Sequence, residues 1–283
     1  MKQRQVGIEL LRIISMMMVL GLHANFMGIG VPSPDKILSG PEILQVLMQS
    51  LCIVAVNVFV MISGWFGIRP SVKGFCNFMW QVIFMVGAAY CVEAVFFHQP
   101  VGMMDIMKVF GLFYGGGWFV GAYIGLYILS PILNNFVETA SKRQIITTLS
   151  AFFIFQFLWG DTLSTAFIAC GYSTFSFIGL YILAGCLRRL HLNIDRTVLI
   201  VAIIAFTVIN AALYIAASWF NMIGLRDIVL NYINPLVIAE ASAMLLLFAG
   251  ITISHTPICQ SCIKFIAKSF AACRDTLCVE HVL

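Results

Sequence analysis

Apolar runs of about 20 residues recur along the chain and constrain its fold more than any other feature. At about 1.5 Å of rise per residue, an α-helix needs roughly 20 such residues to cross the hydrocarbon core of a bilayer. The chain is 61% hydrophobic and only 10% charged, whereas soluble domains are about 25% charged. Membrane barrel strands would alternate in polarity over about 10 residues, and the runs here do not. We therefore expect an all-α, polytopic transmembrane helical bundle.

Eight segments have the length and composition of spans, and the basic residues between them set the orientation. The expected spans cover 8–27, 43–66, 75–97, 118–137, 145–159, 166–187, 198–220 and 235–253. One side carries Lys2, Arg4, Arg69, Lys73, Lys142, Arg143, Arg188, Arg189, Arg196, Lys264 and Lys268. The other side carries Lys36, Lys108 and Arg226. The positive-inside rule places the larger set and the N-terminus in the cytoplasm. The stretch 98–117 fits a surface-lying or re-entrant segment better than a ninth span.

Charge and cysteine patterns argue against several other classes of protein. The net charge of +4 comes from basic residues scattered between apolar runs, so we expect no nucleic-acid partner. The nine cysteines lie mostly inside apolar segments and do not resemble a secreted disulfide framework. The first span is too long for the apolar region of a cleavable signal peptide, so we expect none. These patterns indicate a multi-pass protein of the cytoplasmic membrane, with membrane lipid as a partner.

Ionisable side chains inside the first expected span indicate a functional site. Such groups cost about 2.5–3.5 kcal/mol each in a membrane helix, so they usually face a protein interior. Glu9 precedes Arg12 by three residues, the spacing of an ion pair on one helix face. His23 follows Arg12 by eleven residues, which places both on one face about 16 Å apart along the axis. An imidazole there would suit a general base. The alternative is an interfacial Glu9 and Arg12 with a packing histidine.

Two further carboxylates, Glu93 and Glu240, fall at a membrane depth similar to that of His23 under this topology. We hypothesise that one of them approaches the imidazole and raises its basicity. The alternative is that each glutamate bonds a nearby hydroxyl or amide.

Four blocks of sequence occur in an order that is typical of one membrane family. The block 7–23 contains an acidic residue three before an arginine, then ten residues, then a histidine. The blocks 56–66, 118–134 and 177–189 end in Ser-Gly-Trp-Phe, in Ser-Pro-Ile-Leu-Asn and in Leu-Arg-Arg. Together they resemble the membrane acyltransferase 3 family over about residues 7–270. Glu9 stands where that family more commonly has aspartate.

The resemblance implies transfer of an acyl group, in particular an acetyl group. The co-substrate would be acyl-CoA on the cytoplasmic side, with no bound cofactor and no metal. The acceptor would be a hydroxyl of a surface polysaccharide or of a lipid-linked sugar. His23 carries over as the catalytic base, and Arg12 would hold it in register or meet the negative charge of CoA.

The resemblance also suggests substrate contacts, each with a simpler alternative. Arg69 and Lys73 are candidate contacts for the phosphates of CoA, and the alternative is plain positive-inside charge. Trp118 and Tyr123 would line the site or stack on a sugar or adenine ring. The alternative for these two is an aromatic belt at the membrane surface.

The end of the chain departs from the family pattern, which commonly continues to about ten spans. We expect residues 1–270 to form the acyltransferase domain and 271–283 to be an atypical tail from a truncated or shifted reading frame. Such a truncation would lower stability and activity. A rival interpretation is a zinc site, because a two-residue spacing suits zinc ligands. Its residues would be Cys259, Cys262, Cys273, Cys278 and His281.

Two other functions stay open at this point. A transporter or glycan flippase would also hold ionisable residues at mid-membrane, although transporters commonly show internal repeats and none is visible in this sequence. The third interpretation is an inactive remnant of an acyltransferase.

Overall fold

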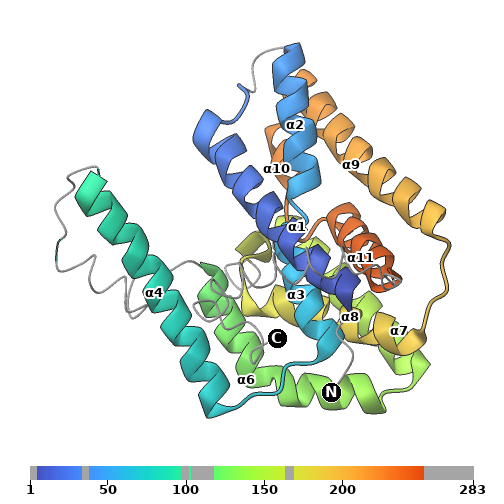
Figure 1. Cartoon of the computed structure of the whole chain (residues 1–283). Helices are drawn as coiled ribbons and strands as arrows, with labels where there is room; N and C mark the ends of the chain where they lie inside the picture. Colours follow the sequence, from blue (N-terminus) through green and yellow to red (C-terminus); the bar gives the residue numbers. More distant parts are fainter. Residues whose placement is uncertain (1–4, 34–37, 97–101, 103–117, 163–168, 252–283) are drawn as a thin grey trace, which may run out of the picture. The chain divides into compact units, whose positions relative to one another are not determined.

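The computed structural model describes residues 5–33, 38–96, 102, 118–162 and 169–251, which are helical with no strand in these ranges (Figure 1). The expected all-α fold class is therefore confirmed. The chain divides into two compact units. The first unit is Met1–Phe66 with Leu133–Ile253, and the second is Gly67–Ile132 with Ser254–Leu283.

In the first unit, helix α1 (Val6–Leu22) continues directly into a π-helix, η1 (His23–Ile29). One face of this continuous helix is buried, at spacings of three and four residues: Ile8, Leu11, Ser15, Met18, Leu22 and Asn25. This spacing is that of a helix with one apolar stripe against its neighbours. The residues on the other faces are partly or fully exposed.

The second expected span is divided into two helices, α2 (Gly40–Cys52) and α3 (Ala55–Phe66). Ser39 and Glu42 form a capping box before α2, with the Ser39 backbone N–H donating to the Glu42 carboxylate at 2.7 Å. This reciprocal capping satisfies backbone donors at the helix start. The helix therefore begins at residue 40, earlier than predicted.

Helix α3 forms the core of the first unit. It packs against α1, α8 (Thr174–Leu190) and α11 (Pro235–Ala249). Nearly all of its side chains are buried. Gly64 permits close contact with α8, because a Cβ at that position would lie 2.8 Å from the Cα of Tyr181. Small residues at such crossings let membrane helices approach closely.

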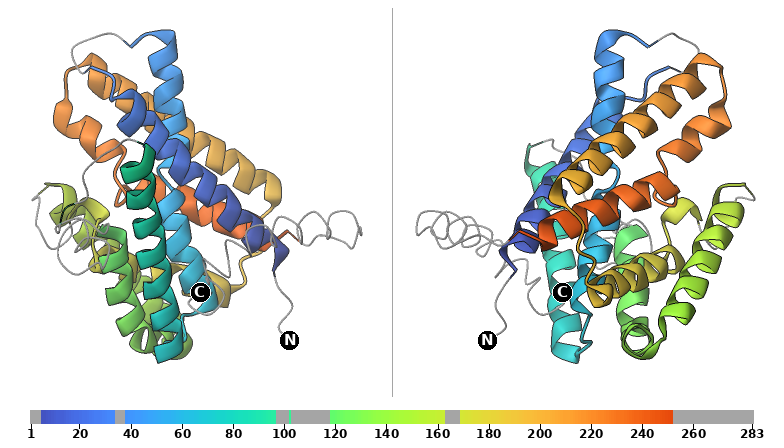
Figure 2. Two further views of the ribbon diagram at one scale, coloured as in Figure 1. Left: turned by 60° about the vertical axis from the view of Figure 1, so that its left-hand side comes forward. Right: turned by 90° about the vertical axis from the view of Figure 1, so that its right-hand side faces the viewer.

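Helix α9 (Arg196–Trp219) lies beside α2 and α11, as the views in Figure 2 show. A tight turn at Asn221, whose φ is 53°, leads into the short helix α10 (Ile223–Val229), which packs back on α9. Helix α10 was not predicted from the sequence.

The remaining helices of the first unit are α7 (Lys142–Phe157), η2 (Leu158–Thr162), η3 (Ala169–Gly171) and α8. The prediction of a span beginning at residue 166 is wrong at its start. Cys170 and Gly171 have positive φ angles of 55° and 95°, which interrupt a right-handed helix. Ser173 then caps α8 by accepting from the Ser176 N–H, so the helix begins at Thr174.

The second unit contains α4 (Val72–Phe96) and α6 (Trp118–Thr139) as far as Ile132. Tyr127 of α6 fixes the start of α4: its hydroxyl donates to Ser71 O at 2.8 Å and accepts from Ser71 N at 2.7 Å.

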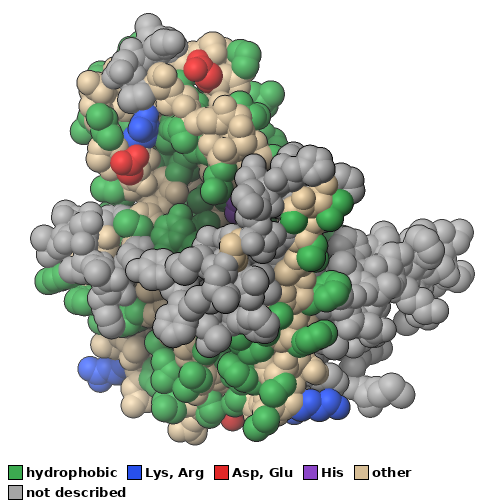
Figure 3. Space-filling view, turned by 90° about the vertical axis from the view of Figure 1, so that its left-hand side faces the viewer, with side chains coloured by type: hydrophobic (Ala, Val, Ile, Leu, Met, Phe, Trp, Pro, Cys, Tyr) green, Lys and Arg blue, Asp and Glu red, His purple; other side chains and the backbone are tan. Residues whose placement is uncertain are grey.

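Helices lie at all eight predicted span positions, and within the described ranges four are long and apolar enough to cross a membrane. These are Val6–Ile29, Gly40–Phe66, Trp118–Thr139 and Arg196–Trp219. Along α9, Val198, Val201, Ile204 and Val208 are 50–58% exposed, as lipid-facing side chains would be. On the face shown in Figure 3, hydrophobic side chains are spread over the described surface and charged side chains are few. The count of eight spans stays a prediction. Almost all of 98–117, and everything from residue 252 onward, lies outside the described residues.

Candidate functional site

The expected ion pair on α1 is present. Arg12 Nη1 lies 2.9 Å from Glu9 Oε1, and the two side chains are 14% and 36% exposed. One turn of helix separates them, so the contact needs no distortion of the backbone. The pair largely neutralises the arginine inside the first unit.

Arg12 has a second contact and one free donor. Its guanidinium carbon lies 5.4 Å from the ring centroid of Phe66 at the end of α3, which is cation–π distance. Its Nε is buried without a hydrogen-bond partner. A buried N–H without an acceptor is costly, so an acceptor brought to this atom would stabilise it.

His23 lies at the junction where α1 becomes the π-helix. Its Nδ1 is 2.8 Å from Val19 O. A carbonyl oxygen only accepts, so this contact is a hydrogen bond when Nδ1 carries the proton. The His23 side chain is exposed, and its role as a catalytic base stays a prediction.

Asn25 anchors the π-helix that follows His23. Its Nδ2 donates to Gln45 O at 2.8 Å and to Gln49 Oε1 at 3.0 Å on α2. Gln45 in turn donates to Gly30 O at 2.6 Å. These amide contacts hold the backbone around the imidazole, and the sequence analysis did not identify them. The signal available in the sequence was an asparagine two residues after the histidine.

The two proposed proton partners differ in what the structure describes. Glu240 is fully buried in α11, where its Oε1 accepts from Thr207 Oγ1 at 2.6 Å and its Oε2 has no partner. This is the alternative in which the glutamate bonds a nearby hydroxyl. Glu93 lies in α4 of the second unit, and its side chain is outside the described part. A contact between either carboxylate and His23 stays a prediction.

The predicted substrate contacts all belong to the second unit. Trp118 begins α6 and is 37% exposed, with its ring edge on Phe119. Tyr123 is only 4% exposed, with ring centroids 5.3 Å from Phe78 and 5.8 Å from Phe119. Tyr123 is therefore a packed core aromatic in this unit, whereas Trp118 is partly exposed.

The two basic candidates of the second unit are exposed. Arg69 lies in the segment before α4, and Lys73 lies in the first turn of that helix. Both are accessible to an anion, and neither is fixed by a hydrogen bond among the described contacts. Their role as CoA contacts stays a prediction.

Buried asparagines form a polar layer that the sequence analysis did not predict. Asn57 of α3 donates to Tyr232 O at 2.9 Å. Asn234 caps α11 through Leu236 N and donates to Val229 O at 2.6 Å. Asn210 of α9 accepts weakly from Asn234 at 3.5 Å. The available signal was a single asparagine inside each of the apolar runs 43–66 and 198–220, and another directly before the run 235–253.

Metal ligands do not cluster in the described part of the chain, where no group of three or more His, Cys, Asp or Glu side chains could hold an ion. The alternative zinc site falls entirely on residues after 251, outside that part.

Comparison with known proteins identifies a family. A family model described as an acyltransferase domain, Acyl_transf_3, matches residues 5–270. No curated protein and no solved structure matches the chain.

Proposed function

The chain belongs to the acyltransferase 3 family, and from that premise we propose that it transfers an acyl group from acyl-CoA to a sugar hydroxyl with His23 as the base. The family and the apolar helices make it a multi-pass membrane acyltransferase. The acetyl group, the surface polysaccharide or lipid-linked sugar acceptor and the cytoplasmic membrane belong to the proposal.

The hydrogen bond of His23 supports this proposal more than any other observation. With Nδ1 donating to Val19 O at 2.8 Å, the neutral ring keeps its lone pair on Nε2. The side chain is exposed, so Nε2 is accessible to a substrate hydroxyl. A fixed tautomer with a free, accessible lone pair is what a general base requires.

The proposed reaction balances without a cofactor. Nε2 accepts the hydroxyl proton as the sugar oxygen attacks the thioester carbonyl, forming a C–O bond. The tetrahedral intermediate then collapses, the C–S bond breaks, and the leaving thiolate takes the proton from the imidazolium. The products are a sugar ester and free CoA.

Arg12 would bind the CoA part of the acyl donor, away from the thioester. Under the predicted topology it lies toward the cytoplasmic end of α1, where CoA would enter. Its buried and unpartnered Nε is a donor for a phosphate or carbonyl oxygen of that substrate. Glu9 would keep the guanidinium oriented through the 2.9 Å contact. Arg69, Lys73, Trp118 and a proton partner among Glu93 and Glu240 remain candidates for the same reaction.

The test compares two histidine variants of the full chain in cells. We expect His23→Asn to abolish surface-glycan acetylation, read by mass spectrometry, while the protein still inserts in the membrane. His191→Asn is the matched control, because His191 is exposed at the C-terminus of α8 and its φ of 45° is one that asparagine tolerates. Normal acetylation in His23→Asn would refute the proposal. Loss of glycan export would instead favour a flippase.

A further inference from the structure

The short helix α10 has the exposure pattern of a helix at a membrane surface. Large apolar side chains on and just before it are exposed, by 38–74%: Trp219, Phe220, Met222, Ile223 and Leu225. A helix that presents aromatic and aliphatic side chains outward typically lies at the boundary of headgroups and acyl chains. Lipid headgroups would therefore surround α10.

Arg226 lies on α10 but is turned toward the protein. Its side chain is only 12% exposed. Its Nε and Nη1 are buried and have no hydrogen-bond partner. The nearest carboxylate oxygen, on Asp227, is 3.9 Å away on a side chain that is 71% exposed, too far for a hydrogen bond. The guanidinium therefore keeps at least two donors without an acceptor.

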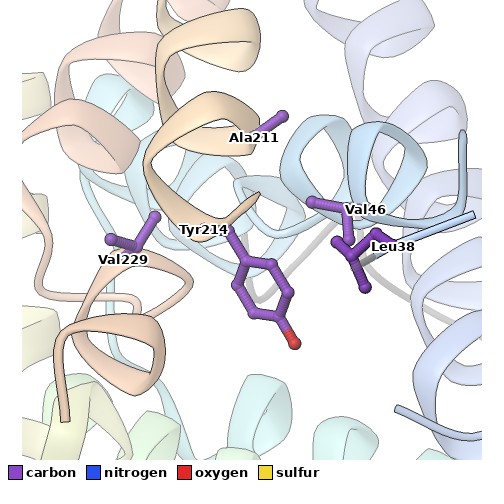
Figure 4. Packing of buried hydrophobic residues seen from close by; sticks show 5 residues of the cluster. All are labelled: Leu38, Val46, Ala211, Tyr214 and Val229. Carbon is purple, nitrogen blue, oxygen red and sulfur yellow. The ribbon is translucent and has the colours of Figure 1, made fainter. Parts of the chain in front are cut away.

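Tyr214 of α9, whose ring lies under the guanidinium, carries a third unsatisfied group. The guanidinium carbon of Arg226 lies 5.7 Å from the Tyr214 ring centroid. The tyrosine is 3% exposed, and its hydroxyl is buried without a partner. Figure 4 shows this hydroxyl pointing away from the hydrophobic side chains around the ring, which include Leu38, Val46, Ala211 and Val229.

A cation with free donors and a buried hydroxyl together favour an anionic ligand. Buried donors are normally satisfied in native proteins, so three on two contacting side chains indicate a missing acceptor. An oxyanion would accept from all three and would offset the arginine charge. Phosphate is the anion that occurs at headgroup depth in a membrane.

We propose that Arg226 and Tyr214 bind the phosphate group of a lipid, at headgroup depth between α9 and α10. The phosphate belongs either to a lipid-linked sugar or to a phospholipid headgroup. The first source rests on the proposed function and deepens it, because the acceptor would then be held by its phosphate.

The position of the site relative to His23 supports a role with the acceptor. Phe26 of η1, three residues after His23, contacts the Tyr214 ring at a centroid distance of 6.0 Å. A lipid phosphate at Arg226 would therefore lie beside the same π-helix that begins with the imidazole. Its sugar would extend toward the base.

The experiment measures lipid binding by the purified full chain in detergent. Three probes are titrated separately: a polyprenyl monophosphate, phosphatidylglycerol and inorganic phosphate. Bound lipid is read by native mass spectrometry and stabilisation by thermal unfolding. We expect saturable binding of at least one probe, with a Kd raised about tenfold or more in Arg226→Gln and severalfold in Tyr214→Phe, because charged hydrogen bonds contribute most.

The control is Arg143→Gln, which removes the same charge from an exposed position in the first turn of α7. Binding of the polyprenyl phosphate alone assigns the site to the acceptor, and equal binding of phosphatidylglycerol assigns it to headgroups in general. Equal affinity in wild type, Arg226→Gln and Arg143→Gln overturns the proposal, and Tyr214→Phe decides it if Arg226→Gln does not fold. His23→Asn should bind the lipid probes with unchanged affinity, because His23 is not part of the phosphate site. If this variant still acetylated the glycan, the catalytic proposal would be refuted and the lipid-phosphate proposal would stand.

Discussion

Two arginines of the first unit lie over aromatic rings, at 5.4 Å and 5.7 Å, yet only one has a carboxylate at hydrogen-bond distance. Arg12 contacts Glu9 at 2.9 Å, whereas Arg226 is 3.9 Å from Asp227. The difference follows from spacing along the helix. Residues three apart share a face, but adjacent residues do not. Arg12 is therefore neutralised within the protein, and Arg226 is left for a charge from outside.

The largest effect should come from Gly64→Ala, which separates the helices that support the whole unit. The new Cβ would collide with the Tyr181 backbone in α8. We expect a loss of about 3 kcal/mol in the free energy of unfolding, at the upper end of overpacking effects. Gly121→Ala is the control, because nothing lies within 4 Å of its Cβ position in α6. Thermal unfolding in detergent measures both, and equal stability would show that the close approach is absent.

Replacing each arginine with methionine should show that the two arginines contribute differently to the free energy of unfolding. Arg12→Met leaves Glu9 unpaired, and we expect the free energy of unfolding to fall by about 2 kcal/mol. This loss is smaller than that for a fully buried ion pair, because Glu9 is 36% exposed to solvent. Arg226→Met removes donors that have no acceptor, so stability without added lipid should change by no more than about 1 kcal/mol. Similar losses in both variants would mean that Arg226 has a protein partner.

Neutralising the carboxylate beside each arginine tests the same difference with smaller expected effects. We expect Glu9→Gln to cost about 1 kcal/mol, because it weakens a half-buried charged hydrogen bond. Asp227→Asn should cost under about 0.5 kcal/mol, as is usual for exposed pairs. Denaturant unfolding of the two variants at low and high salt provides the measurement. A larger effect for Asp227→Asn would reverse the assignment of the paired and unpaired arginine.

The smallest effect concerns Asp195, a carboxylate stabilised by backbone amides instead of a cation. It caps α9, and the hydrogen bond from the Thr197 N–H holds its pKa below the ordinary value of 3.8. A lowered pKa means that the stabilisation is present above about pH 4 and is lost as the pH falls through the folded-state value.

The stability difference between wild type and Asp195→Ala should accordingly be largest at pH 7 and shrink toward pH 3. Ser141→Ala, which removes the uncharged cap of α7, should show a difference that does not change with pH. Thermal unfolding at the two pH values separates these behaviours, and parallel behaviour of the two variants would contradict the charge-based cap.

The helical fold and the Glu9–Arg12 pair could be predicted from the sequence because both depend on local spacing. Run length predicts membrane helices, and a separation of three predicts a contact within one helix. The helix boundaries were harder to predict from the sequence. The late start of α8 depends on the backbone at Cys170 and Gly171, and the break between α2 and α3 falls at residues 53–54, inside an uninterrupted apolar run.

The environment of each polar side chain could not be predicted, because it depends on which helices meet. Equal depth suggested a shared site for His23 and Glu240, but depth does not determine which face a residue presents. Glu240 is bonded to Thr207 across α9 and α11. Arg226 was interpreted as a topological charge, since nothing in the sequence shows that the turn at Asn221 brings it back onto Tyr214.

The π-helix at His23–Ile29 also bears on how this region tolerates changes in length. A π-turn contains about one more residue than an α-turn, so it is equivalent to an α-helical turn into which one residue has been inserted. Deleting one residue after Asn25 should therefore be absorbed by return to α-helical geometry, whereas the same deletion inside α1 would rotate the Glu9–Arg12 pair away from Phe66. For mutagenesis by insertion or deletion, the segment beside the base is thus the permissive end of the helix, and the arginine end is the restrictive one.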